Sequence, residues 1–241
     1  MNVSSKALLG VGLLVIAPAS FAQNYSMELT GVGNGTVADG VYVSPYVATI
    51  SGPGMSYSGF VICDDFNSEA YLNTPWIATM SNAGALDGTQ KFGAAPGSKI
   101  SFNGSTYTIQ QAYNAAGWLA NGLMANANTN LQTSYAFAIW DIFDGQSTDP
   151  NGNGLSTDPT GAVGLEAAAF AAASSSTNPY VASDVSVFTP SAANSNPELR
   201  DTQEFLVVHA APEVDPTAAA SGISLLLGGV LVLRGRRKLG A

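Results

Sequence analysis

The sequence is poor in positive charge, cysteine and histidine. It holds 8 lysines and arginines against 17 aspartates and glutamates, with 1 cysteine and 1 histidine, and its formal net charge is −9. Because nucleic-acid binding needs a basic face that neutralises phosphates, this balance argues against a nucleic-acid partner. A single cysteine excludes a disulfide framework, and a single histidine leaves almost no material for a histidine-based triad or a zinc site. We therefore expect a protein that is not an enzyme and needs no cofactor.

Apolar residues are plentiful and form 46% of the 241 residues. That content is enough for a sizeable core in one or two domains, and it excludes a disordered acidic tail. Five of the 8 cations flank the two hydrophobic ends of the chain: Lys6, Arg234, Arg236, Arg237 and Lys238. The stretch between those ends keeps 3 cations and 15 acids, so its charge is about −12.

Residues 1–22 have the pattern of a secretory signal peptide. Lys6 supplies the positive charge, residues 7–17 form an apolar run, and small residues precede the bond between Ala22 and Gln23. The apolar run is too short to span a bilayer, which argues against a retained anchor. We therefore expect export, with cleavage by signal peptidase between Ala22 and Gln23.

The other end of the chain carries a second apolar run, residues 218–233, followed directly by a basic cluster at 234–238. As a helix this run rises about 24 Å, which is marginal for the hydrocarbon core unless flanking residues extend it. The basic cluster would hold this end in the cytoplasm and leave the preceding residues outside. The pattern fits a transient transmembrane helix or a plain stop-transfer anchor, whereas a buried helix does not explain the basic cluster.

The motif Pro212-Glu213-Val214-Asp215-Pro216, the apolar helix and the basic end together resemble a PEP-CTERM sorting signal. Such tails occur on exported proteins of Gram-negative bacteria that make exopolysaccharide. The resemblance implies cleavage near the motif by exosortase, a membrane-embedded protease. The sequence departs from the name-giving motif, since Val214 stands where a second proline would be.

These patterns divide the chain into three parts. They are a signal peptide at 1–22, an extracytoplasmic domain at 23–210, and a sorting tail at 211–241 with its motif at 212–216, helix at 217–233 and basic end at 234–238. The middle part is predicted to begin and end with strands and to carry helices between them. Strands are predicted across 24–62, with a turn-rich interval at 31–40 and the strongest strand composition at 41–50 and 55–62, and again at 185–188 and 204–208. A hairpin is predicted at 100–109 around Asn103-Gly104, and helices at 112–124, 131–143 and 162–173. This order predicts a single β-rich α+β domain with two or three helices in the middle.

The middle part also resembles thioester-domain proteins. The resemblance rests on three segments, 60–66 (FVICDDF), 116–119 (AGWL) and 136–140 (AFAIW). In that family a cysteine on a strand and a glutamine on a helix condense to an internal thioester, which implies a covalent adhesin that acylates an amine on its partner. Cys63 and Trp140 match this pattern, but Ala136 occupies the position of the glutamine. The resemblance therefore implies a domain of this shape without the crosslink.

Two alternatives accompany that interpretation. Gln132 lies one helical turn before Ala136 on the same face, and a displaced helix would be needed to bring it to Cys63. Cys63 is either a packed core thiol or a reactive one. Its apolar neighbours favour packing, and the adjacent Asp64 and Asp65 would raise the pKa of the thiol.

A polar segment follows the second predicted helix. Asp149, Asn151, Asn153 and Gly154 are spaced like the opening half of an EF-hand calcium loop, but Thr160 stands where that loop needs a bidentate glutamate. The same residue types form ordinary polar turns. The sequence is therefore compatible with two interpretations of this segment, a polar turn and a weak calcium site at Asp149, Asn151 and Asn153.

The preferred interpretation is an exported, non-catalytic protein of the cell surface or the exopolysaccharide matrix, sorted through the inner membrane and acting in adhesion or biofilm structure. Its partners would be signal peptidase and exosortase during processing, then exopolysaccharide. Exposed aromatic side chains are predicted to contact carbohydrate: Tyr46, Tyr57, Tyr71 and Trp76. The alternatives are the covalent adhesin through Cys63 and a glycan-active hydrolase that uses paired carboxylates. The candidate carboxylate pairs are Asp64/Asp65 and Asp141/Asp144.

Overall fold

The computed structural model describes residues 23–38, 40–93, 98–144 and 161–209. Six strands, all paired antiparallel to their neighbours, close into a barrel. In barrel order they are β1 (Asn24–Gly31), β4 (Tyr46–Gly52), β5 (Met55–Cys63), β10 (Phe205–Val208), β9 (Val185–Pro190) and β6 (Trp76–Asn82). Closure leaves no free sheet edge in the barrel.

Alternation of side chains explains how the barrel is filled. Along β1, Tyr25, Met27 and Leu29 are buried while the residues between them are exposed or half-buried, because successive strand side chains point to opposite faces. Large rings from three different strands meet in the core, with Phe205 of β10 in contact with both Tyr46 of β4 and Trp76 of β6 at 6.0 Å between ring centroids. The barrel is therefore packed with side chains.

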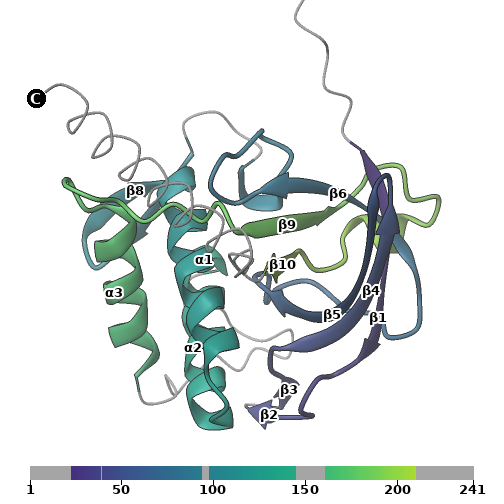
Figure 1. Ribbon diagram of the computed structural model, residues 1–241, viewed down its shortest axis with the longest axis horizontal. Coiled ribbons are helices and arrows are strands. Elements are labelled where there is room, and N and C mark those ends of the chain that lie inside the picture. The colour runs from purple at the N-terminus through teal and green to yellow at the C-terminus, as the bar shows by residue number, and fades with distance from the viewer. Residues whose placement is uncertain (1–22, 39, 94–97, 145–160, 210–241) are drawn as a thin grey trace, which may run out of the picture.

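Three helices lie together on one side of the barrel (Figure 1). They are α1 (Ile109–Ala125), α2 (Thr129–Asp144) and α3 (Ala162–Ala173). Each helix contacts the other two, while α1 contacts β10 and α2 contacts β5. A capping box starts α1, since the Thr108 hydroxyl accepts from the Gln111 backbone N–H and the Gln111 side chain accepts from the Thr108 backbone N–H.

Two small hairpins complete the described fold. β2 (Val37–Ala38) pairs with β3 (Val41–Tyr42), and β7 (Lys99–Phe102) pairs with β8 (Ser105–Thr108). The second hairpin turns at Asn103 and Gly104, whose φ angles of 45° and 74° are those of a type I′ turn. Short 3-10 helices span Lys91–Gly93 (η1) and Pro197–Arg200 (η2).

The structure confirms a β-rich α+β domain with three helices in the middle. It corrects the predicted strand at 41–50, which is two strands, β3 and β4, separated by the Ser44–Pro45 pair. Proline lacks a backbone N–H for a ladder, so the strand breaks there. β6 was not among the strands predicted from the sequence.

The signal peptide and the sorting tail lie outside the described residues, together with Ala22, the motif at 212–216 and the basic end at 234–238. Within the described parts of the chain, none of the helices has the length and apolar character needed to cross a membrane. Gln23, the predicted first mature residue, is exposed and accepts a hydrogen bond from the Tyr25 hydroxyl at 3.1 Å.

Candidate functional site

Cys63 is the last residue of β5, where it pairs with Phe205 of β10. Its side chain is fully buried, and no disulfide involves it. The backbone N–H of Cys63 donates to the Ser44 hydroxyl at 3.0 Å, and the thiol donates to the Asp65 carbonyl at 3.2 Å. The thiol is thus a packed and hydrogen-bonded core group, as the apolar neighbours of Cys63 in the sequence predicted.

The electrostatic surroundings keep that thiol protonated. Burial raises the pKa of Cys63 well above its ordinary value, and the nearby carboxylates of Asp65 and Asp64 raise it further. A hydrogen bond with the Asp65 backbone and the approach of the Trp140 indole lower the pKa only in part. Because the thiolate is the nucleophile, this environment disfavours covalent chemistry at Cys63. The predicted direction of the shift is confirmed, with burial as its largest cause.

Helix α2 brings Ala136 and Trp140 to this part of the core, and both residues are buried. Ala136 carries no carboxamide, so it offers no acyl partner for the thiol. Gln132, one turn earlier, is held elsewhere: its amide nitrogen donates to the Asn126 carbonyl at 2.7 Å, and its amide oxygen accepts from Asn34 at 3.1 Å. The helix-borne glutamine is therefore occupied by contacts away from Cys63.

The strand pairing brings another glutamine beside the cysteine, and the sequence analysis missed it. Phe205 faces Cys63 across the β5–β10 ladder, so Gln203, two residues earlier, lies diagonal to Cys63 on the same side. Gln203 is 8% exposed, and its side-chain oxygen has no hydrogen-bond partner. The signal was weak, because Gln203 immediately precedes a predicted strand whose neighbour the sequence does not specify.

A network around Glu204 lies next to the cysteine in the core. The carboxylate of Glu204 accepts from the hydroxyls of Tyr113 and Thr189 and from the Lys91 backbone N–H, the last at 2.8 Å. The Lys91 ammonium forms a salt bridge with the buried carboxylate of Asp65. Lys91 is one of only three cations between the two ends of the chain, and the structure places it where a buried acid needs a counter-charge.

Asp64 and Asp144 belong to the same cluster. Burial raises the pKa of Asp64 well above its ordinary value, and the carboxylates of Glu204 and Asp65 add to the shift. Burial also raises the pKa of Asp144 to about 6, although its carboxylate accepts from the Phe66 backbone N–H at 2.6 Å. Asp64 and Asp65 lie in the core rather than along a cleft. The paired carboxylates that a glycosidase needs are not brought to the pocket described next.

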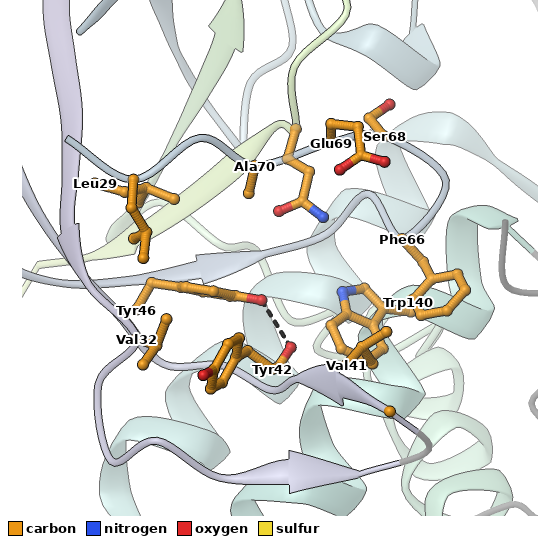
Figure 2. Close-up of a pocket in the computed structure, with 13 residues that line it drawn as sticks. Leu29, Val32, Val41, Tyr42, Tyr46, Phe66, Ser68, Glu69, Ala70 and Trp140 are labelled. Atoms are coloured by element: carbon orange, nitrogen blue, oxygen red, sulfur yellow. Dashed lines mark hydrogen bonds between the residues drawn. The ribbon is translucent and has the colours of Figure 1, made fainter. Parts of the chain in front are cut away.

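A pocket of about 460 Å³ opens at this end of the barrel (Figure 2). Aromatic side chains, aliphatic side chains and a few polar groups line it: Leu29, Val32, Gly40, Val41, Tyr42, Tyr46, Phe66, Ser68, Glu69, Ala70, Leu72, Trp140 and Gln203. The Tyr46 hydroxyl points to the rim and donates to the Tyr42 carbonyl at 2.7 Å. This volume and mixed lining are typical of a small-ligand pocket.

The predicted carbohydrate-contacting aromatics are only partly in place. Tyr46 lines the pocket but is buried, and Trp76 is buried in the barrel core. The exposed ring at the pocket is Tyr42, which the sequence analysis did not single out. The prediction that Trp76 is exposed is wrong, because β6 directs that side chain into the core.

The candidate calcium residues Asp149, Asn151 and Asn153 lie outside the described residues. Within the described ranges, histidine, cysteine, aspartate and glutamate side chains form no group of three or more that could hold a metal ion.

No family model and no curated protein matches the chain. Among solved structures, it is similar to the N-terminal domain of the Streptococcus pyogenes pilus tip adhesin Cpa. The identity is 12%, the match covers 81% of this chain and 97% of that chain, and the TM-score is 0.38. A TM-score this low does not establish a shared fold.

Proposed function

We propose that residues 23–210 form an exported, non-catalytic binding domain of the cell surface or the exopolysaccharide matrix, which acts in adhesion or biofilm structure through reversible contacts. In this proposal exosortase processes the chain at 212–216, after transient passage through the inner membrane. The binding site is the pocket beside Cys63, defined by Tyr42, Tyr46, Trp140 and Gln203.

The observation that supports reversible binding is the state of Cys63. Its thiol is sealed in the core, donates to the Asp65 carbonyl and has a raised pKa. On α2 the position expected to supply an acyl group is Ala136. Nucleophilic chemistry needs an activated thiol and an acyl partner within reach. The raised pKa leaves the Cys63 thiol unactivated, and Ala136 of α2 supplies no acyl group.

Fractionation of cells that express the full chain, with mass spectrometry of the mature protein, tests the export and sorting part of this proposal. The expected product begins at Gln23, lacks residues 218–241 and occurs at the surface or in the extracellular matrix. A chain with Asp215→Ala and Pro216→Ala in the motif should stay in the membrane fraction with its tail attached. Recovery of wild-type protein that retains residues 218–241 would contradict the sorting proposal.

A second candidate function rests on Gln203. This glutamine has an unpartnered side-chain oxygen and lies diagonal to Cys63 across the β5–β10 ladder. Condensation of the Cys63 thiol with the Gln203 carboxamide would form a thioester and release ammonia, so the domain would be a covalent adhesin. A thioester lowers the mass by about 17 Da, and methylamine opens it. A Gln203→Leu variant with no mass deficit, beside a wild type that has one, would establish this candidate.

A further inference from the structure

Gln203 presents an uncompensated acceptor at the pocket. Its side-chain oxygen is buried and has no hydrogen-bond partner, and Gln203 lines the pocket. A buried polar atom without a partner destabilises the protein, so a ligand that supplies a donor recovers that loss. The wall that carries Gln203 is preformed, because its backbone N–H donates to the Glu69 carbonyl at 3.0 Å.

Trp140 presents the matching donor. Its indole nitrogen is buried, and no acceptor receives the N–H with hydrogen-bond geometry, although the ring approaches the Cys63 thiol closely enough to lower its pKa. Figure 2 shows the nitrogen edge of the Trp140 ring turned toward the open space of the pocket. A hydroxyl group both donates and accepts hydrogen bonds, so a ligand with neighbouring hydroxyls satisfies both Gln203 and Trp140.

The aromatic lining and the charge of the pocket restrict the class of ligand further. Tyr42, 49% exposed, offers a ring face at the rim, and Phe66 lies in the wall against Trp140 at 5.1 Å between ring centroids. Among the described residues, Glu69 is the one charged side chain in the lining, and the stretch between the chain ends has a net charge of about −12. These charges repel an anionic ligand. The unpartnered polar atoms, the aromatic lining and the acidic surroundings together fit a ligand ring that is hydroxylated at its edge, apolar on its faces and uncharged.

We propose that this pocket binds a neutral sugar residue of a glycan, with its hydroxyls on Gln203 and Trp140 and its ring face on Tyr42. This proposal rests on the proposed function, because it names the ligand class of the same site. Binding is reversible and needs neither the thiol of Cys63 nor a metal ion.

Titration of the ¹⁵N-labelled domain with methyl glycosides of glucose, galactose, mannose and N-acetylglucosamine tests the proposal. The readout is the indole N–H signal of each of the 3 tryptophans, assigned with a Trp140→Phe variant. At least one glycoside should shift the Trp140 signal in a saturable way. Trp76 is the internal control, because its indole nitrogen is also buried without a partner but does not line the pocket. Its signal should not move.

Gln203→Leu keeps the size of the side chain and removes the acceptor. Because the oxygen has no partner in the free protein, this variant should fold with at least the stability of the wild type and bind the glycoside about five-fold or more weakly. Ser58→Ala, an exposed change on β5 outside the pocket lining, should bind as the wild type does. A Gln203→Leu variant that binds as tightly as the wild type would overturn the proposal.

Two further titrations distinguish a neutral sugar from other classes of ligand. Glucuronic acid should bind more weakly than methyl glucoside, because its carboxylate meets the acidic surroundings. N-acetyltyrosinamide represents a protein partner, and a Trp140 shift with this probe but with none of the glycosides would contradict the glycan proposal. Failure of every glycoside would also overturn it, while the processing experiment on the tail would be unaffected.

Discussion

Asp64 lies against Glu204 in the core, and its backbone N–H donates to the Glu204 carbonyl at 3.4 Å. Neither side-chain oxygen of Asp64 receives a hydrogen bond from a donor group, whereas Glu204 accepts from Tyr113, Thr189 and the Lys91 backbone. An ionised Asp64 would thus be an uncompensated buried charge. A protonated Asp64 instead donates to Glu204, which agrees with the raised pKa of Asp64.

This pair predicts a stability that falls as pH rises. The folded-state pKa values of Asp64 and Glu204 are both raised, mainly by burial, so the folded state retains protons that the unfolded state loses above about pH 4. Asp64→Asn cannot ionise and should flatten the decline of the unfolding free energy above pH 4. The exposed, non-titrating change Ser58→Ala should leave the slope as it is. Urea unfolding at a series of pH values measures both, and an equal slope in Asp64→Asn would contradict the carboxyl pair.

The raised pKa of Asp144 predicts a second contribution to the loss of stability with rising pH, confined to a defined pH range. Its pKa is raised to about 6, so its contribution to the fall in stability lies between about pH 4 and pH 6. Asp144→Asn should remove this component, because the amide oxygen still accepts from the Phe66 N–H but carries no charge. The same urea series checks it, and a wild type whose stability rises over this window would show that the assigned pKa direction is wrong.

Two helical glycines predict opposite effects of the same substitution. A Cβ at Gly117 of α1 would lie 2.4 Å from the Cβ of Ala182, whereas a Cβ at Gly164 of α3 would meet nothing within 4 Å. Gly117→Ala should therefore destabilise the domain by about 1–3 kcal/mol through overpacking. Gly164→Ala should stabilise it by about 0.4–1 kcal/mol, because the unfolded chain loses conformational freedom. Thermal unfolding compares them, and a neutral Gly117→Ala would contradict the packing of α1 against Ala182.

The burial of Cys63 predicts a protected thiol. In the native protein Cys63 should react with Ellman's reagent on the order of a hundred-fold or more slowly than after unfolding in guanidinium chloride, because reaction requires local opening. Ala192→Cys, at an exposed position of the loop after β9, provides a reactive reference within the same fold. Rapid native labelling of Cys63 would show that the thiol is accessible.

Local signals in the sequence predicted much of this fold. The strand-forming residues of 55–62, the Asn103-Gly104 turn and the helical spacing of the middle segments each depend on neighbours within a few residues. β6 was not predicted because its buried positions include the small side chains of Ala78 and Ser81. The sequence of this strand therefore shows no alternation of large apolar and polar residues. The break at Pro45 was visible in the sequence and should have divided the predicted strand.

The candidate site was harder to predict, because it is built by pairing between distant strands. Cys63 and Trp140 were recognised from their local surroundings, but the position of Gln203 diagonal to Cys63 follows only from the β5–β10 register. Lys91 and Glu204 meet through a contact that spans 113 positions in the chain. Sequence periodicity fixes which face of a strand is buried, not which strand lies beside it.

The most direct test of the account is the intact mass of the mature protein after denaturation in the presence of iodoacetamide. A free Cys63 gains one carbamidomethyl group, about 57 Da above the mass of the unmodified chain, and this is the result that reversible binding predicts. A Cys63–Gln203 thioester would leave the thiol unavailable and the chain about 17 Da below its calculated mass. That second result would contradict the central claim that the domain binds without covalent chemistry.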